Sequence, residues 1–207
     1  MKKIIYTLSI LLGFALSANA QIESLAGPRF GLVYISESPG TSFLNGDLPL
    51  DEMGDLPENY NDIAKGALTS LYGWQWESRF ADGGEVTGIV EWIALVGGME
   101  KGKFLPSVSS MVGARTASGL EFAVGPNLSL TGIAMVFGVG YNFKSGKLNI
   151  PVNIAFVPGR SKTQEGHVEN RGPDDEWGTS DDVNYDYIVD YHTGNRFSIT
   201  LGFNLSK

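Results

Sequence analysis

The side chains best suited to bind a ligand lie in an acidic segment near the C-terminus. Residues 173–186 contain Gly178 and the carboxylates of Asp174, Asp175, Asp181, Asp182 and Asp186. Calcium takes several oxygen ligands that converge around a turn, so this segment is a candidate metal site. It does not match an EF-hand loop, because with Gly178 at the sixth position Pro173 and Trp177 would occupy ligand positions. We favour a solvated acidic loop and keep a calcium site as the alternative.

The second group of reactive side chains surrounds the only two histidines, His167 and His192. Ser161 and Asp190 lie in the same stretch, so a Ser–His–Asp arrangement that acts on lipid is the enzymatic alternative. The chain has no Gly-x-Ser-x-Gly elbow, and proximity in sequence is not triad geometry. We therefore interpret the histidines as solvated, and we expect no catalytic residues, no enzymatic activity and no organic cofactor.

The beginning of the chain predicts export. Lys2 and Lys3 precede an apolar run from Ile4 to Leu16 that is too short and wrongly flanked for a stop-transfer helix. A small-residue pattern then predicts cleavage between Ala20 and Gln21.

Cleavage there divides the chain into a signal peptide, residues 1–20, and one domain, residues 21–207. The absence of cysteine excludes a lipid-modified cysteine, disulfides and thiolate metal sites. The net charge is −8, and sixteen of the 23 acidic residues lie in segments 37–66 and 159–195. Such a surface repels phosphate, so nucleic acid is a poor partner. Because both segments lack strand periodicity, we predict long solvated loops there.

The last residues of the chain show an unbroken alternation of apolar and polar side chains. From Arg196 to Ser206, the apolar residues are Phe197, Ile199, Leu201, Phe203 and Leu205. A period of two places them all on one face of a strand. After an export signal, a strand of about 10 residues with one apolar and one polar face is typical of a transmembrane β-barrel.

Seven other segments show the same period, with 104–116 the weakest because serines interrupt it. They are residues 29–36, 71–80, 85–96, 104–116, 120–130, 133–143 and 148–156. Short glycine-containing turns join the second strand to the third, the fourth to the fifth and the sixth to the seventh. The two acidic segments follow the first and seventh strands. This alternation predicts an all-β, eight-stranded, antiparallel up-and-down transmembrane β-barrel with short periplasmic turns and two long acidic extracellular loops.

Four motifs carry a resemblance to a known group of proteins. They are Gly27-Pro-Arg-Phe-Gly31, Trp74-Gln-Trp-Glu77, Gly125-Pro-Asn-Leu-Ser129 and Gly202-Phe-Asn-Leu205. With them, the chain resembles the small outer-membrane barrels of the OmpX, OmpW and OmpA type, and more closely barrel proteins of Bacteroidota-type genomes. The resemblance implies a monomer in the outer membrane, in contact with its lipid and inserted by the barrel-assembly machinery. The usual terminal aromatic residue is missing, so recognition by that machinery would depend on Phe203.

The interior of such a barrel is expected to be polar. The predicted inward residues are Arg29, Gln75, Glu77, Arg79, Glu91, Arg115, Glu121, Asn127, Asn142 and Asn153. Eight strands leave an interior that side chains can fill. We therefore favour a plug of polar side chains that pair with one another over a gated pore. The predicted function is non-enzymatic: envelope structure, surface binding or adhesion through the loops. The alternative is a narrow channel or small-ligand carrier, including a soluble lipocalin-like periplasmic barrel, which would face water with polar residues.

Overall fold

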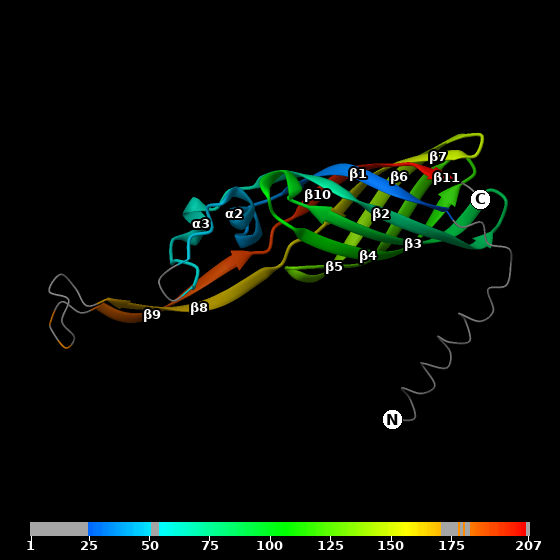
Figure 1. Ribbon diagram of the computed structural model, residues 1–207. Coiled ribbons are helices and arrows are strands. Elements are labelled where there is room, and N and C mark those ends of the chain that lie inside the picture. The colour runs from blue at the N-terminus through cyan, green and yellow to red at the C-terminus, as the bar shows by residue number, and fades with distance from the viewer. Residues whose placement is uncertain (1–24, 51–53, 171–177, 179, 181–182, 206–207) are drawn as a thin grey trace, which may run out of the picture.

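A closed antiparallel barrel of eight strands forms the body of the molecule (Figure 1). This computed structural model describes residues 25–50, 54–170, 178, 180 and 183–205. The first seven strands are β1 (Leu25–Ile35), β2 (Ala67–Asp82), β3 (Val86–Gly97), β4 (Leu105–Thr116), β5 (Leu120–Ser129), β6 (Gly132–Ser145) and β7 (Leu148–Val157). The eighth has two parts, β10 (Arg196–Gly202) and β11 (Asn204–Leu205). The barrel closes because β10 pairs with both β1 and β7.

All eight predicted strands are confirmed, including the one over residues 104–116. The period of two is the reason: inward and outward side chains alternate along each strand. In β4, for example, Ser109, Met111 and Arg115 are buried, whereas Val108 and Val112 are exposed. The serines that blur the sequence pattern therefore do not interrupt the strand.

The prediction of a loop over residues 159–195 is wrong for most of its length. β8 (Ser161–Asn170) and β9 (Val183–His192) form an antiparallel hairpin that projects beyond the barrel (Figure 1). The aromatic and β-branched residues of β9 favour a strand, but the many acidic residues of this segment led to the prediction of a loop. Gly166 lies opposite Tyr187, and the Tyr187 ring lies where a Cβ on Gly166 would be.

The 37–66 segment also has regular structure, with helices α2 (Pro39–Asn45) and α3 (Tyr60–Ile63). A capping box begins α2: the Ser38 side chain accepts a hydrogen bond from the Thr41 amide, and the Thr41 hydroxyl accepts one from the Ser38 amide. Gly46, at φ +80°, ends the helix in the left-handed conformation. Periodicity misses α2 because seven residues make barely two turns. No helix in the described part of the chain is long and apolar enough to cross a membrane.

The two ends of the barrel differ in their connections. At one end, here called the turn end, short turns join β2 to β3, β4 to β5 and β6 to β7. The opposite end, the loop end, has both long segments and a 3-10 helix, η1 (Met99–Lys101), between β3 and β4. The link from β5 to β6 is also at the loop end, yet it is only Leu130-Thr131. The alternation of short and long connections is therefore incomplete, although it predicted the strand order.

Candidate functional site: the barrel interior

The barrel is polar inside and apolar outside. The predicted inward residues that are buried are Arg29, Gln75, Glu77, Glu91, Arg115, Glu121, Asn127 and Asn142. Arg79 and Asn153 are half-buried. The outer wall exposes large apolar side chains, among them Tyr34, Tyr72, Trp74, Trp76, Trp92, Ile199 and Leu201. The predicted orientation of the strands is confirmed.

A cluster of paired charges fills the half of the interior near the turn end. Arg115 donates from both terminal nitrogens to Glu77, at 2.6 and 2.5 Å, and from Nε to Glu121. Gln75 donates to Glu91 from the neighbouring strand. Buried charges are tolerated when they are paired and hydrogen-bonded, as Arg115, Glu77 and Glu121 are. This half matches the plug expected from the sequence.

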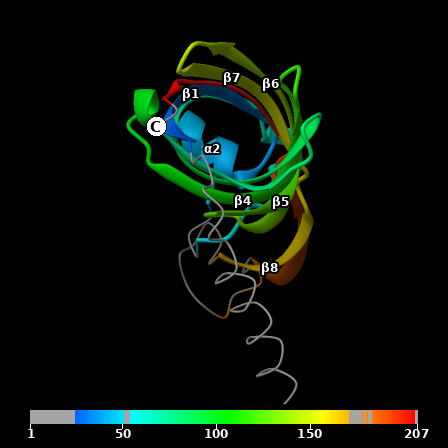
Figure 2. The same cartoon turned by 90° about the vertical axis from the view of Figure 1, so that its right-hand side faces the viewer.

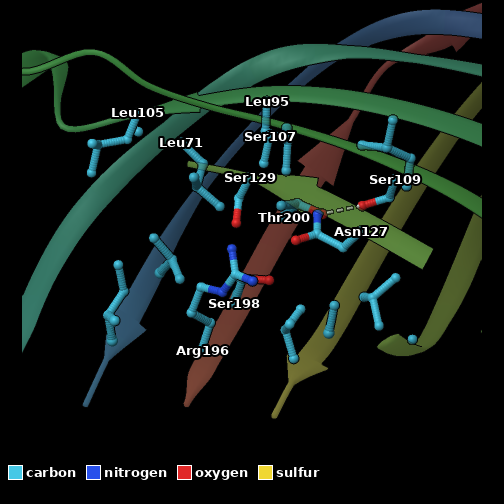
Figure 3. Close-up of a pocket in the computed structure, with 18 of the residues that line it drawn as sticks. Leu71, Leu95, Leu105, Ser107, Ser109, Asn127, Ser129, Arg196, Ser198 and Thr200 are labelled. Carbon is cyan, nitrogen blue, oxygen red and sulfur yellow. Dashed lines mark hydrogen bonds between the residues drawn. The ribbon is translucent and has the colours of Figure 1, made fainter. Parts of the chain in front are cut away.

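The half near the loop end is not filled, and here the expectation of a complete plug is wrong. It contains a cavity of about 310 Å³ (Figure 3). Apolar residues of the cavity wall include Val33, Leu71, Ile93, Leu95, Leu105 and Met111. Polar residues of the wall include Ser109, Asn127, Ser129, Arg196, Ser198 and Thr200. The space exists because the inward positions of β6, β7 and β10 here carry small residues, such as Gly138, Ala155 and Ser198.

Helix α2 lies across the loop end of the barrel. Viewed from the turn end, it crosses the far opening of the ring (Figure 2). Gly40 and Phe43 of α2 line the cavity. Two lysines after β3 hold the helix: Lys101 Nζ donates to Asn45 Oδ1 at 3.0 Å, and Lys103 Nζ lies 4.3 Å from the centre of the Phe43 ring. The cavity is thus covered by a short, capped helix.

A second apolar core lies outside the barrel, between the 37–66 segment and the β8–β9 hairpin. Its buried members are Leu56, Tyr60, Tyr187 and Val189. The Tyr187 hydroxyl donates to the Leu56 carbonyl at 2.8 Å, and Asn61 donates to the Asp190 carbonyl at 2.8 Å. Burial raises the pKa of Tyr60. We call this unit the hairpin platform; it consists of residues 54–64 and the β8–β9 hairpin.

A carboxylate also joins two strand ends at the loop end. Glu100 in η1 accepts hydrogen bonds from the hydroxyls of Thr69, at 2.5 Å, and Ser70. These hydrogen bonds, that of Ser70 most of all, lower the pKa of Glu100 from 4.5 to about 2. The contact ties the β3–β4 connection to the beginning of β2.

Most of the residues predicted for calcium cannot be placed. Asp174, Asp175, Asp181 and Asp182 lie outside the described residues, as do Ala20 and Gln21 of the predicted cleavage site. Asp186 lies in β9 and not in a loop, with its carboxylate 2.6 Å from His167 Nδ1. Among the residues that the structure describes, no group of three side chains is placed to hold a metal ion. The calcium site stays a prediction.

The described contacts around His192 do not assemble a triad. Ser161 is the cross-strand neighbour of His192, but the Nδ1 atom of that histidine faces the Gly194 amide at 3.2 Å. The Asp190 carboxylate accepts instead from Thr163, at 2.6 Å.

Arg196 is the cavity residue that sequence reasoning missed. Its place on the polar face of the last strand was predicted, but not its position beside open space. One signal could have singled it out: the inward residues that follow it in the strand are Ser198, Thr200, Gly202 and Asn204, all uncharged.

Comparison with known proteins returned no match to a protein-family model and none to a curated protein. We therefore argue function from the geometry of the barrel.

Proposed function

We propose that the protein is an integral outer-membrane β-barrel without enzymatic activity, which presents the hairpin platform at the cell surface. The observation that carries this proposal is the exposed apolar wall around a polar interior. Leaving Trp76 50 % and Trp92 53 % exposed is unfavourable in water but favourable against lipid. A lipocalin-like barrel would have the opposite arrangement, with polar residues outside.

The two ends of the molecule suggest different roles. The buried charge cluster fills the barrel near the turn end, which argues against an open ion channel. The hairpin platform extends away from the opposite end, where it is free of the barrel wall (Figure 1). We propose surface binding or adhesion through this platform, with the turns and both chain ends in the periplasm.

Fractionation of a Gram-negative host that expresses the full chain tests the location. We expect the protein in the outer-membrane fraction, extractable only with detergent. We also expect the folded barrel to migrate differently from the boiled protein on a denaturing gel. Recovery in the soluble periplasmic fraction would contradict the proposal and favour a soluble barrel.

The cavity favours a second candidate function, that of a small-ligand carrier. Its volume of about 310 Å³ is at the lower limit of pockets that bind small molecules, about 300–1,000 Å³. This candidate is compatible with either location, because the cavity lies inside the barrel.

A further inference from the structure

We infer that the cavity at the loop end binds a small amphipathic anion with one negative charge, of the class of medium-chain carboxylates, and that Arg196 binds its head group. This inference rests on the small-ligand candidate above and names the class of ligand. It does not depend on the membrane location.

Arg196 is the first observation. It lies at the beginning of β10, opposite Ile35 of β1 and Val157 of β7, and it lines the cavity. Figure 3 shows its guanidinium group directed into the space between Ser129 and Ser198. Within the described part of the chain, no carboxylate forms an ion pair with Arg196. A half-buried guanidinium without an anionic partner is costly, and a bound anion would remove that cost.

An anionic head group cannot bind at the side of the cavity next to the charge cluster. Glu91 and Glu121 line the cavity at the side of the charge cluster, where Gln75 and Arg115 already donate to them. Both carboxylates repel an anion. The head group must therefore lie at Arg196, on the other side of the cavity.

The walls determine the rest of the ligand. Ser129 and Ser198 lie on either side of the Arg196 guanidinium in the view of Figure 3 and supply hydroxyl groups that can donate to carboxylate oxygens. Thr200 adds a third hydroxyl to the wall, farther along β10. Leu71, Leu95 and Leu105 lie together on another part of the wall, where only an apolar group gains from contact. A polar head and an apolar body on one small molecule match this division.

The charge of the ligand follows from the same residues. One guanidinium can bind one carboxylate through two parallel hydrogen bonds. Arg196 is the one cationic side chain among the described residues that line the cavity, so the second charge of a dianion would be left unpaired there. Phosphate monoesters and dicarboxylates are therefore poor ligands, and a monocarboxylate with an aliphatic body is the best match.

The test is equilibrium binding of radiolabelled decanoate to the full barrel in lipid nanodiscs, with empty nanodiscs subtracted. Decanol, which has the same body and no charge, is the second probe. We expect saturable binding of one decanoate per barrel, with an affinity at least tenfold higher than for decanol. Arg196→Gln should remove that difference by weakening decanoate binding alone.

A matched pair of variants tests the position of the apolar body. Ala155→Phe adds a ring to the cavity wall and should reduce binding of both probes, whereas Ala94→Phe adds the same ring to the outer face of β3 and should reduce neither. No saturable binding above empty nanodiscs would overturn the inference. Equal affinity of the wild type for decanoate and decanol, a result that needs no variant, would also overturn it. Unchanged decanoate binding in Arg196→Gln would do the same.

Fractionation of the same variants separates this inference from the proposed location. Arg196→Gln protein in the outer membrane without decanoate selectivity would support both. Wild-type protein in the outer membrane that fails to bind decanoate would refute only the ligand. Soluble wild-type protein that binds decanoate selectively would refute only the location.

Discussion

At the scale of single residues, neighbours in one strand have opposite surroundings. Ile199 is 50 % exposed on the outer wall, whereas Ser198 lines the cavity beside Arg196. The loss of stability caused by an introduced charge should therefore depend on whether the residue faces outward or inward.

Ile199→Arg should lower the free energy of unfolding by about 2–4 kcal/mol if residue 199 lies near the bilayer midplane. Urea titration of the barrel in lipid vesicles measures this change. Ser198→Arg is the control on the inner face. Because the cavity has room for the side chain, its cost should come from repulsion by Arg196, and Arg196→Gln should relieve it. Equal costs for the two variants, with no relief, would contradict the assigned orientation.

Arg115→Met should destabilise the barrel strongly, by about 3–5 kcal/mol, because it leaves Glu77 and Glu121 buried without their partner. Adding Glu77→Gln should restore part of the loss, since it removes one of the uncompensated charges. Urea titration again gives the free energies. Arg160→Met, at an exposed arginine, is the matched control and should have little effect. A small change in Arg115→Met would mean that water, and not Arg115, solvates these carboxylates.

At the scale of elements, segments that are far apart in sequence hold each other in place. The hairpin platform joins residues near Tyr60 to residues near Tyr187 through one apolar core. An isolated two-stranded hairpin is at best marginally stable in water, so we expect each segment to depend on the other for its fold.

Tyr187→Ala should loosen the hairpin platform without unfolding the barrel. It removes a buried ring and the hydrogen bond to the Leu56 carbonyl, a local cost of about 3 kcal/mol. Limited proteolysis should then cut residues 54–64 much faster than in the wild type, with the barrel fragment intact. Ile188→Ala removes a side chain that is 66 % exposed on the opposite face of β9 and should change cleavage little. Equal cleavage of both variants would argue against this core.

Glu100 should make the loop end sensitive to acid. Its pKa is about 2 in the folded protein and 4.5 ordinarily, so its contribution to stability is fully present above pH 4.5 and is lost as the pH falls towards 2. The difference in unfolding free energy between wild type and Glu100→Gln should therefore shrink across that interval. Glu37→Gln, at an exposed carboxylate, is the comparison. A difference independent of pH would refute this role of the hydrogen bonds from Thr69 and Ser70.

At the scale of the whole molecule, the two ends of the barrel should face different compartments. The chain has no cysteine, so single introduced thiols report on topology without background. Asp47→Cys at the loop end should react with a membrane-impermeant maleimide on intact cells. Ser118→Cys in the β4–β5 turn should react only after permeabilisation of the outer membrane. The reverse result would mean that the barrel is inverted, and equal labelling of both in a soluble fraction would mean that it does not span the membrane.

The amino-acid sequence was sufficient to predict the eight barrel strands and which side chains share a face of each strand. A strand repeats every two residues, so a local pattern such as Phe197, Ile199 and Leu201 is sufficient for both conclusions. The export signal supplied the direction of the faces, because a barrel strand in a bilayer turns its apolar face to lipid and its polar face to the interior.

The division of the interior and the structure of the acidic segments depend on contacts between residues that are far apart in the sequence. The level at which inward residues of different strands meet depends on the tilt and register of the closed barrel, which no single strand specifies. Register brings Arg115 to Glu77 and Glu121 in one half, and leaves Arg196 beside a cavity in the other. The β8–β9 hairpin was not predicted for a related reason. The segment around Tyr60, which packs against it, is more than a hundred residues away in the chain.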